Sequence, residues 1–108
     1  MATDAVFAAL ADPTRRAILD LLREHATLTA GGIAGRFTGI SRPAVSKHLR
    51  VLREAGLVRT EERGREHHYT LDAEPLGELQ RRWLDRFAPH WDASLRRLKA
   101  EAETDRAP

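Results

Sequence analysis

The sequence of 108 residues contains no cysteine. Composition therefore excludes disulfide bonds, thiolate metal sites, thiol redox switches and cysteine nucleophiles. The sequence also lacks a run of about 20 apolar residues, the length that spans a bilayer. Residues 1–10 have no basic start followed by an apolar stretch, the pattern of a secretion signal. We therefore expect a cytoplasmic protein without membrane contact.

Neither sign of charge is in large excess, since the net charge is +2. Apolar residues make up 42% and charged residues 31%, a globular balance that predicts one domain over residues 1–102 and a flexible tail at 103–108. Residues 36–65 contain eight basic and three acidic residues, a local net charge of +5. This middle third is therefore a candidate anion-binding surface, although a solvated basic face has the same composition.

Two helices are expected at the start of the chain, and a third follows them. Residues 4–11 have an apolar side, and Asp12-Pro13 supplies an N-cap and a first helical residue for a helix over 13–23. Thr29 should cap a third helix that ends near Phe37, although two glycines weaken its first turn.

The most regular helical pattern comes next. A turn at residues 38–40 leads to Ser41, a favourable N-cap for a helix that reaches Ala55. Gly56 suits the left-handed C-terminal cap of that helix. Three apolar residues at helical spacing form its inward stripe: Val45, Leu49 and Leu52.

The pattern then changes to that of a hairpin and a final helix. Residues 57–63 and 66–71 flank a turn at Gly64-Arg65, where glycine allows a positive φ. After Pro75 a long amphipathic helix is expected, and Pro89 should kink or break it near residue 88.

A short turn between two helices, with a basic second helix and a hairpin behind it, is typical of a winged helix-turn-helix domain. We therefore predict a mainly α fold of four helices, a β-hairpin wing and a last helix. Polar side chains on the free faces of the basic helix can bond bases or phosphates, and arginines at the hairpin tip can reach phosphates. The candidate contacts to double-stranded DNA are Ser41, Arg42, Ser46, Lys47, Arg50, Arg63 and Arg65.

Three segments in order carry a resemblance to a known family. Residues 7–19 (FAALADPTRRAIL) and residues 40–58 (ISRPAVSKHLRVLREAGLV) resemble the opening and recognition-helix motifs of ArsR-type repressors, and residues 63–71 (RGREHHYTL) resemble their wing. The resemblance is strong over residues 6–71 and loose in the last helix. Three linked motifs are specific, whereas one alone would not be.

The resemblance implies a homodimer formed by the first and last helices, with recognition helices in successive major grooves of an imperfect palindrome and repression relieved by an effector. By position, the family's DNA contacts correspond to Arg42, Pro43, Ser46 and Lys47, with His48 either touching a phosphate or packed inside. An apolar stripe at helical spacing is more often dimer core than an effector pocket. The predicted interface residues are Phe7, Leu10, Leu79, Trp83, Phe87, Trp91 and Leu95.

The family's metal sites have no counterpart that we can assign. Its cysteine site corresponds to residues 28–33, which contain no thiol, and the last helix offers only His90 and Asp92, in the reverse of the family's order. His67 and His68 are neighbours on a strand and point to opposite faces. We predict no metal and no cofactor, and the identity of an effector stays open.

The alternatives to a DNA-binding repressor are an enzyme and a protein-interaction module. The sequence shows no catalytic triad, paired carboxylates, phosphate loop or metal set, so we predict that it is not an enzyme. A winged-helix module for protein interaction is an alternative, because a fold does not fix a function. A repressor that responds to a small apolar ligand or a metal is another.

Overall fold

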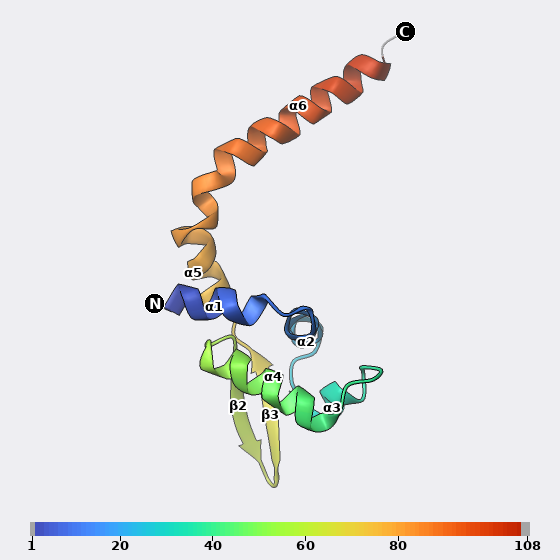
Figure 1. Ribbon diagram of the computed structural model, residues 1–108, viewed down its shortest axis with the longest axis vertical. Coiled ribbons are helices and arrows are strands. Elements are labelled where there is room, and N and C mark those ends of the chain that lie inside the picture. Colours follow the sequence, from blue (N-terminus) through green and yellow to red (C-terminus); the bar gives the residue numbers. More distant parts are fainter. Residues whose placement is uncertain (1, 107–108) are drawn as a thin grey trace. The chain divides into compact units, whose positions relative to one another are not determined.

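The computed structural model describes the backbone of residues 2–106 and the side chains of residues 3–104. Helices alternate with a small sheet (Figure 1). In chain order the elements are α1 (Ala2–Leu10), α2 (Pro13–Glu24), β1 (Leu28–Thr29), α3 (Ala30–Ala34), α4 (Arg42–Glu54), β2 (Val58–Arg63), β3 (Glu66–Leu71), α5 (Glu74–Arg82), the 3₁₀ turn η1 (Leu84–Phe87) and α6 (Ala88–Arg106). They form two compact units, one up to Glu78 and one from Leu79 onward.

Three polar side chains cap the N-termini of α2, α3 and α4. Asp12, Thr29 and Ser41 each accept a hydrogen bond from the backbone N–H three residues later, at 3.0, 3.0 and 3.2 Å. All three have extended backbone conformations, as N-cap residues do. The predicted starts of α2, α3 and α4 are therefore confirmed.

The third helix is shorter than predicted. It ends at Ala34 rather than near Phe37, because the backbone hydrogen bonds change from the α pattern to tighter turns. Arg36 N–H donates to Ile33 O at 3.0 Å and Phe37 N–H to Ala34 O at 3.2 Å, and both bonds span three residues. The turn then closes at Gly39, whose φ is +80°.

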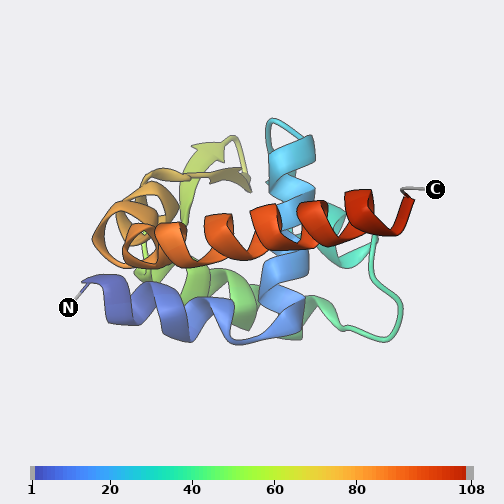
Figure 2. The ribbon, with the colours of Figure 1, turned by 90° about the horizontal axis from the view of Figure 1, so that it is seen from above.

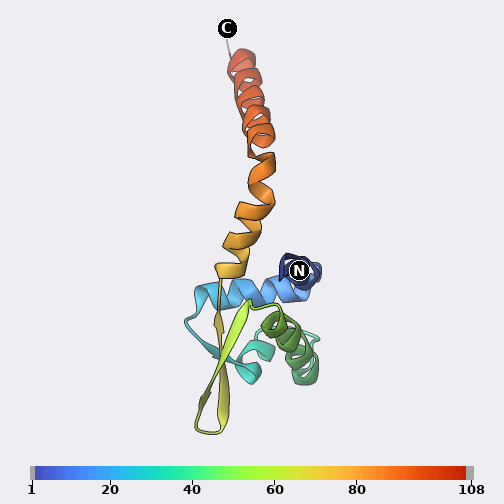
Figure 3. The same ribbon diagram turned by 90° about the vertical axis from the view of Figure 1, so that its left-hand side faces the viewer.

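The predicted hairpin is present and forms part of a three-stranded antiparallel sheet in the order β1-β3-β2. Gly64, with a φ of +65°, lies in the two-residue turn between Arg63 and Glu66, which face each other in the register. The tip of the hairpin extends beyond α3 and α4 (Figure 3). The short strand β1 was not predicted, and it places Thr29 opposite His68.

The core of the first unit forms where the helices pack on one another and on the base of the hairpin. In α1 the buried side consists of Val6 and Ala9, whereas Phe7 is 37% exposed. α2 runs in a clearly different direction from α1 after the corner at Asp12 (Figure 2). The predicted inward stripe of α4 is confirmed as buried. The buried apolar residues of this unit are Val6, Ala9, Ile18, Leu19, Leu22, Ile33, Val45, Leu49, Leu52, Leu57 and Val58.

The predicted long last helix is divided rather than kinked. α5 ends at Arg82, Trp83 adopts a non-helical conformation, and the turn η1 precedes α6. The break therefore lies before residue 88, and Pro89 occupies the first turn of α6, where a proline removes no hydrogen bond. α6 continues to Arg106, so it includes residues 103–106 of the expected tail, and residues 107–108 lie outside the described chain. No helix within residues 2–106 is long and apolar enough to cross a bilayer.

Candidate nucleic-acid interface

α4 presents one polar face, because its apolar stripe is fully used by the core. Val45, Leu49 and Leu52 are at most 1% exposed, and this fixes the rotation of the helix about its axis. The opposite side chains therefore face solvent. The exposed residues of α4 are Arg42, Pro43, Ser46, Lys47, Arg50, Arg53 and Glu54.

The first residue of α4, Arg42, lies beside Gly31 of α3. A Cβ atom built on Gly31 would lie 3.8 Å from Cζ of Arg42, so the guanidinium rests over the first turn of α3 in ordinary van der Waals contact. Arg42 also lines a cavity of about 420 Å³ that reaches from α3 to Arg65 in the hairpin turn. The guanidinium of Arg42 therefore lies beside Gly31, next to both helices of the helix-turn-helix motif.

A second cavity, of about 280 Å³, lies further along α4. It is lined by Ser46, Lys47, Arg50 and Arg53 of α4 and by Tyr69 of β3. The two cavities share Ser46 and Tyr69, and we call them together the helix–wing groove. Ser46, Lys47 and Arg50 were predicted from the sequence as DNA contacts, whereas Arg53 and Tyr69 were not. Arg53 was within reach, since it follows Ser46 by seven residues and so shares its side of the helix.

Five cations of α4 and the wing are not neutralised by the protein itself. By contrast, Arg59 pairs with Asp72 at 3.9 Å, and Arg63 pairs with Glu61 at 3.3 Å. Of the two arginines predicted at the hairpin tip, Arg63 forms an exposed ion pair with Glu61, whereas Arg65 forms none with a described residue. In α4 and the wing, the cations that form no ion pair with any described residue are Arg42, Lys47, Arg50, Arg53 and Arg65.

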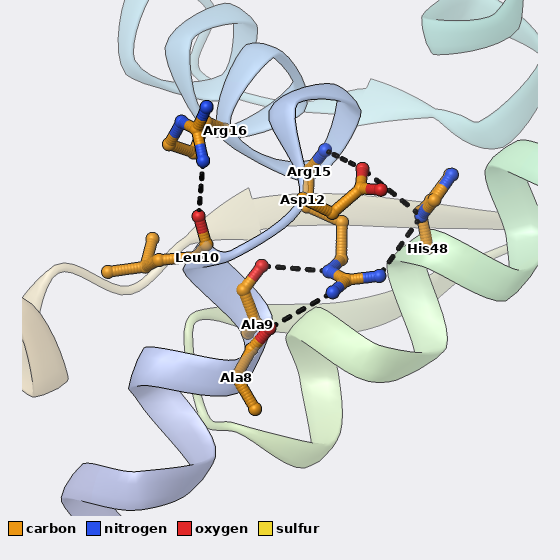
Figure 4. A network of polar contacts seen from close by, with 7 residues as sticks. All are labelled: Ala8, Ala9, Leu10, Asp12, Arg15, Arg16 and His48. Atoms are coloured by element: carbon orange, nitrogen blue, oxygen red, sulfur yellow. Dashed lines mark hydrogen bonds and ion pairs between the residues drawn. The ribbon is translucent and has the colours of Figure 1, made fainter.

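His48 is placed apart from the other candidates, in a network with α1 and α2 (Figure 4). Its Nδ1 lies 3.5 Å from Arg15 Nη1 and 3.9 Å from Asp12 Oδ2, and its side chain is only 23% exposed. A guanidinium only donates hydrogen bonds, so the contact with Arg15 fits the tautomer that carries its proton on Nε2. The structure thus brings His48 to the α1–α2 corner and not into the helix–wing groove.

The surroundings of Asp12 in this network favour the ionised form of its carboxyl group. The pKa of Asp12 lies below its ordinary value, chiefly because the backbone N–H of Arg15 donates to the carboxylate, with further contributions from His48 when its ring is protonated and from the charge of Arg15. Partial burial opposes this lowering. Arg15 also donates from Nε to Ala9 O at 2.7 Å and from Nη2 to Ala8 O at 3.0 Å, so it binds the last turn of α1 (Figure 4).

The residues predicted for a dimer interface differ in accessibility. Leu79 is 5% exposed and is therefore buried within its own chain, and Leu10 is half-buried. In the second unit, the rings of Trp83 and Phe87 meet edge to face with centroids 4.9 Å apart. The exposed apolar residues of that unit are Trp83 (41%), Phe87 (42%), Trp91 (44%), Leu95 (62%) and Leu98 (61%).

The histidines offer no built metal site in the described part of the chain. No group of three potential ligands among histidine, aspartate and glutamate occurs within it. His67 lines the larger cavity, whereas its neighbour His68 lies 3.7 Å from Glu66 through Nε2 and leaves a buried Nδ1 without a hydrogen-bond partner. His90 lies in the first turn of α6, where its carbonyl accepts a hydrogen bond from Ser94.

A basic helix presented beside a wing, with a cationic groove between them, defines a winged helix-turn-helix DNA-binding protein. Residues 10–61 match a family model described as a helix-turn-helix domain. The chain is similar to the HTH-type transcriptional regulator Rv2034 of Mycobacterium tuberculosis, with 48% identity over 92 residues that cover 85% of this chain and 80% of the relative. It is also similar to the transcriptional repressor SdpR of Bacillus subtilis, with 39% identity over 90 residues, or 83% and 97% of the two chains.

A solved structure extends the similarity to the fold. The ArsR-like transcriptional regulator from Rhodococcus sp. RHA1 matches with a TM-score of 0.69 and 38% sequence identity, over 94% of this chain and 92% of that chain. The protein therefore belongs to the ArsR family of DNA-binding transcriptional regulators. The predicted fold class and the predicted family are confirmed, and the family consists of regulators rather than enzymes.

Proposed function

We propose that this protein is a transcriptional repressor that binds an imperfect palindromic operator as a homodimer. The observation that carries the proposal is the set of unneutralised cations along α4 and the wing. A surface cation without a carboxylate partner keeps its full charge for contact with the phosphate backbone of DNA. Such contacts supply most of the affinity for DNA. One similar protein, SdpR, is named a transcriptional repressor.

Within this proposal the two ends of the surface have different tasks. Arg42, at the start of α4, suits the bidentate contact to guanine that specifies sequence in the major groove. Ser46 and Lys47 follow on the same exposed side and support it. Arg65 at the hairpin turn suits a phosphate or the minor groove, contacts that add affinity with little sequence preference. Because such a regulator acts on genomic DNA, the proposal keeps the expected cytoplasmic location.

The proposed dimer rests on exposed aromatic side chains. Trp83, Phe87 and Trp91 are each more than 40% exposed in the single chain, and all three belong to the second unit. Exposed large apolar side chains that gather in one region mark interaction surfaces. A second copy of the chain would bury them and would present two recognition helices to the two halves of a palindrome.

Selection of random duplexes on the purified protein tests the proposal, with and without a chelator. We expect an imperfect palindrome to be enriched whether or not the chelator is present. Arg42→Ala should then lose about 1–3 kcal/mol on the selected site and relax its sequence, whereas Arg65→Ala should weaken all duplexes alike. No enrichment at any salt concentration would refute the proposal and favour a protein-interaction module.

Sedimentation equilibrium tests the dimer separately. We expect the wild-type protein to dimerise and the double variant Trp83→Ala, Phe87→Ala to shift toward monomer. The matched control is Arg86→Ala, which changes an exposed polar side chain of η1 between the two aromatic residues. A monomeric wild type, or a double variant that dimerises as the wild type does, would contradict this part of the proposal.

A further inference from the structure

The smaller cavity of the helix–wing groove has an unusual chemical composition. Three cations line it, namely Lys47, Arg50 and Arg53, and its other two lining residues, Ser46 and Tyr69, carry hydroxyl groups. No carboxylate takes part in the lining. None of the three cations is ion-paired with a described residue, and no described residue hydrogen-bonds the Tyr69 hydroxyl. The cavity therefore gathers donors for which the chain itself supplies no acceptor.

We propose that this cavity binds a phosphate group of the DNA backbone and that Arg53 and Tyr69 are DNA contacts in addition to those predicted from the sequence. A phosphate presents several acceptor oxygens, which suit a guanidinium fork together with hydroxyl donors. The inference rests on the proposed function, because it assumes a bound duplex. It adds a contact at the C-terminal end of the recognition helix.

The position of the cavity gives this contact a distinct role. Arg53 lies in the last turn of α4, eleven residues after Arg42, which corresponds to about 16 Å along a helix. Arg42 at one end reads bases, and a phosphate held at the other end sets the tilt of the helix in the groove. Phosphate contacts fix register and orientation but carry no sequence information directly. Loss of the contact should therefore weaken selected and random duplexes by the same factor.

The contributions of Arg53 and Tyr69 to DNA binding can be measured separately, because only Arg53 carries a charge. Arg53→Gln removes one cation, whereas Tyr69→Phe removes a hydroxyl and keeps the ring. The control is Arg59→Gln, since Arg59 lies on β2, lines a different cavity with Glu61, and is ion-paired with Asp72. Each variant is measured for binding to the selected operator and to a random duplex across a series of chloride concentrations. Thermal unfolding of each variant checks that it is folded.

Charge removal and hydroxyl removal should have different signatures. Each phosphate contact by a cation contributes about −0.9 to the slope of log affinity against log salt, so Arg53→Gln should flatten the slope by about 0.9 on both duplexes. A lost hydrogen bond to a charged group corresponds to roughly tenfold in affinity, so Tyr69→Phe should weaken binding about tenfold with the slope unchanged. Arg59→Gln should leave the slope as in the wild type.

The possible failures are distinguishable. If the wild type binds no duplex, the proposed function fails. If the wild type binds the operator and Arg53→Gln keeps the full slope, only the phosphate contact is overturned. In the last measurement, duplex affinity is determined with inorganic phosphate in place of chloride at constant ionic strength. Loss of duplex affinity in phosphate that Arg53→Gln abolishes supports the duplex contact, because a free phosphate and a duplex phosphate then compete for the same cavity, whereas an effect of phosphate that is the same in both proteins overturns it.

Discussion

Arg15 should contribute more to stability than its neighbour Arg16, although both side chains bind the end of α1. Arg15 donates to two backbone carbonyls there, at 2.7 and 3.0 Å, and also contacts His48 on α4. Arg16 donates to one carbonyl, that of Leu10, at 2.6 Å, and this bond is exposed. The perturbation we consider is Arg15→Ala, with Arg16→Ala as the matched control.

The expected magnitude follows from the number and the exposure of these bonds. Hydrogen bonds that involve a charged group contribute about 1.5–3 kcal/mol when they are well shielded. The bond from Arg15 to Ala9 is partly buried and the bond to Ala8 is exposed, so we expect Arg15→Ala to lower the free energy of unfolding by about 2 kcal/mol. The single exposed bond of Arg16 should contribute about 0.5 kcal/mol.

Urea unfolding at one fixed protein concentration measures both variants, because the stability of a dimer depends on concentration. Arg15→Lys is a useful third variant, since it keeps the charge but replaces the fork with a single ammonium group. It should recover less than half of the loss. If Arg15→Ala unfolds at the same urea concentration as Arg16→Ala, the assignment of Arg15 as the link between α1, α2 and α4 is wrong.

Three further predictions concern local features of the first unit. Ser41→Ala should lower the free energy of unfolding by about 1 kcal/mol, because it removes the N-cap of α4, and urea unfolding against Ser46→Ala checks this. Gly56→Ala should lower it by about 1–2 kcal/mol, because Gly56 has a φ of +79° and the nearest atom to an added Cβ is 3.6 Å away, so the loss is one of backbone conformation. The lowered pKa of Asp12 stabilises the folded state above the unfolded pKa of about 3.9. That contribution is lost as the pH falls through the lower, folded value. Asp12→Asn should therefore flatten the pH dependence of unfolding below about pH 4, and an unchanged acid profile would count against the Asp12 interaction.

Features that depend on neighbours in the chain were predictable from the sequence. The caps at Asp12, Thr29 and Ser41 and the left-handed glycines 56 and 64 are set by local hydrogen bonds and local sterics. The inward stripe of α4 follows from helical periodicity alone. These features were sufficient to predict the winged helix-turn-helix fold and the exposed face of the recognition helix.

Features that depend on residues far apart in the sequence were not predictable from it. A two-residue strand such as β1 has no periodicity to detect, and it exists because β3 lies beside it. His48 has an unremarkable position in the α4 pattern, and only the packing of α1 and α2 determines that it faces Asp12 and Arg15. Tyr69 lines the groove together with residues of α4, and this arrangement of β3 beside α4 is not encoded in any local pattern.

The short strand β1 determines which part of the wing is stiff. It pairs with β3 only at Tyr69 and His68, so β3 is held on both sides at its base, while the tip around Gly64 is a two-stranded ribbon. Thr29 ends β1 and also caps α3, so the base of the wing is joined to the helix-turn-helix motif itself. Thermal bending of the wing is therefore concentrated at its outer end. For the proposed DNA-binding function, this means that the tip can adjust to the width of the groove it meets, while β1 keeps the base of the wing joined to α3.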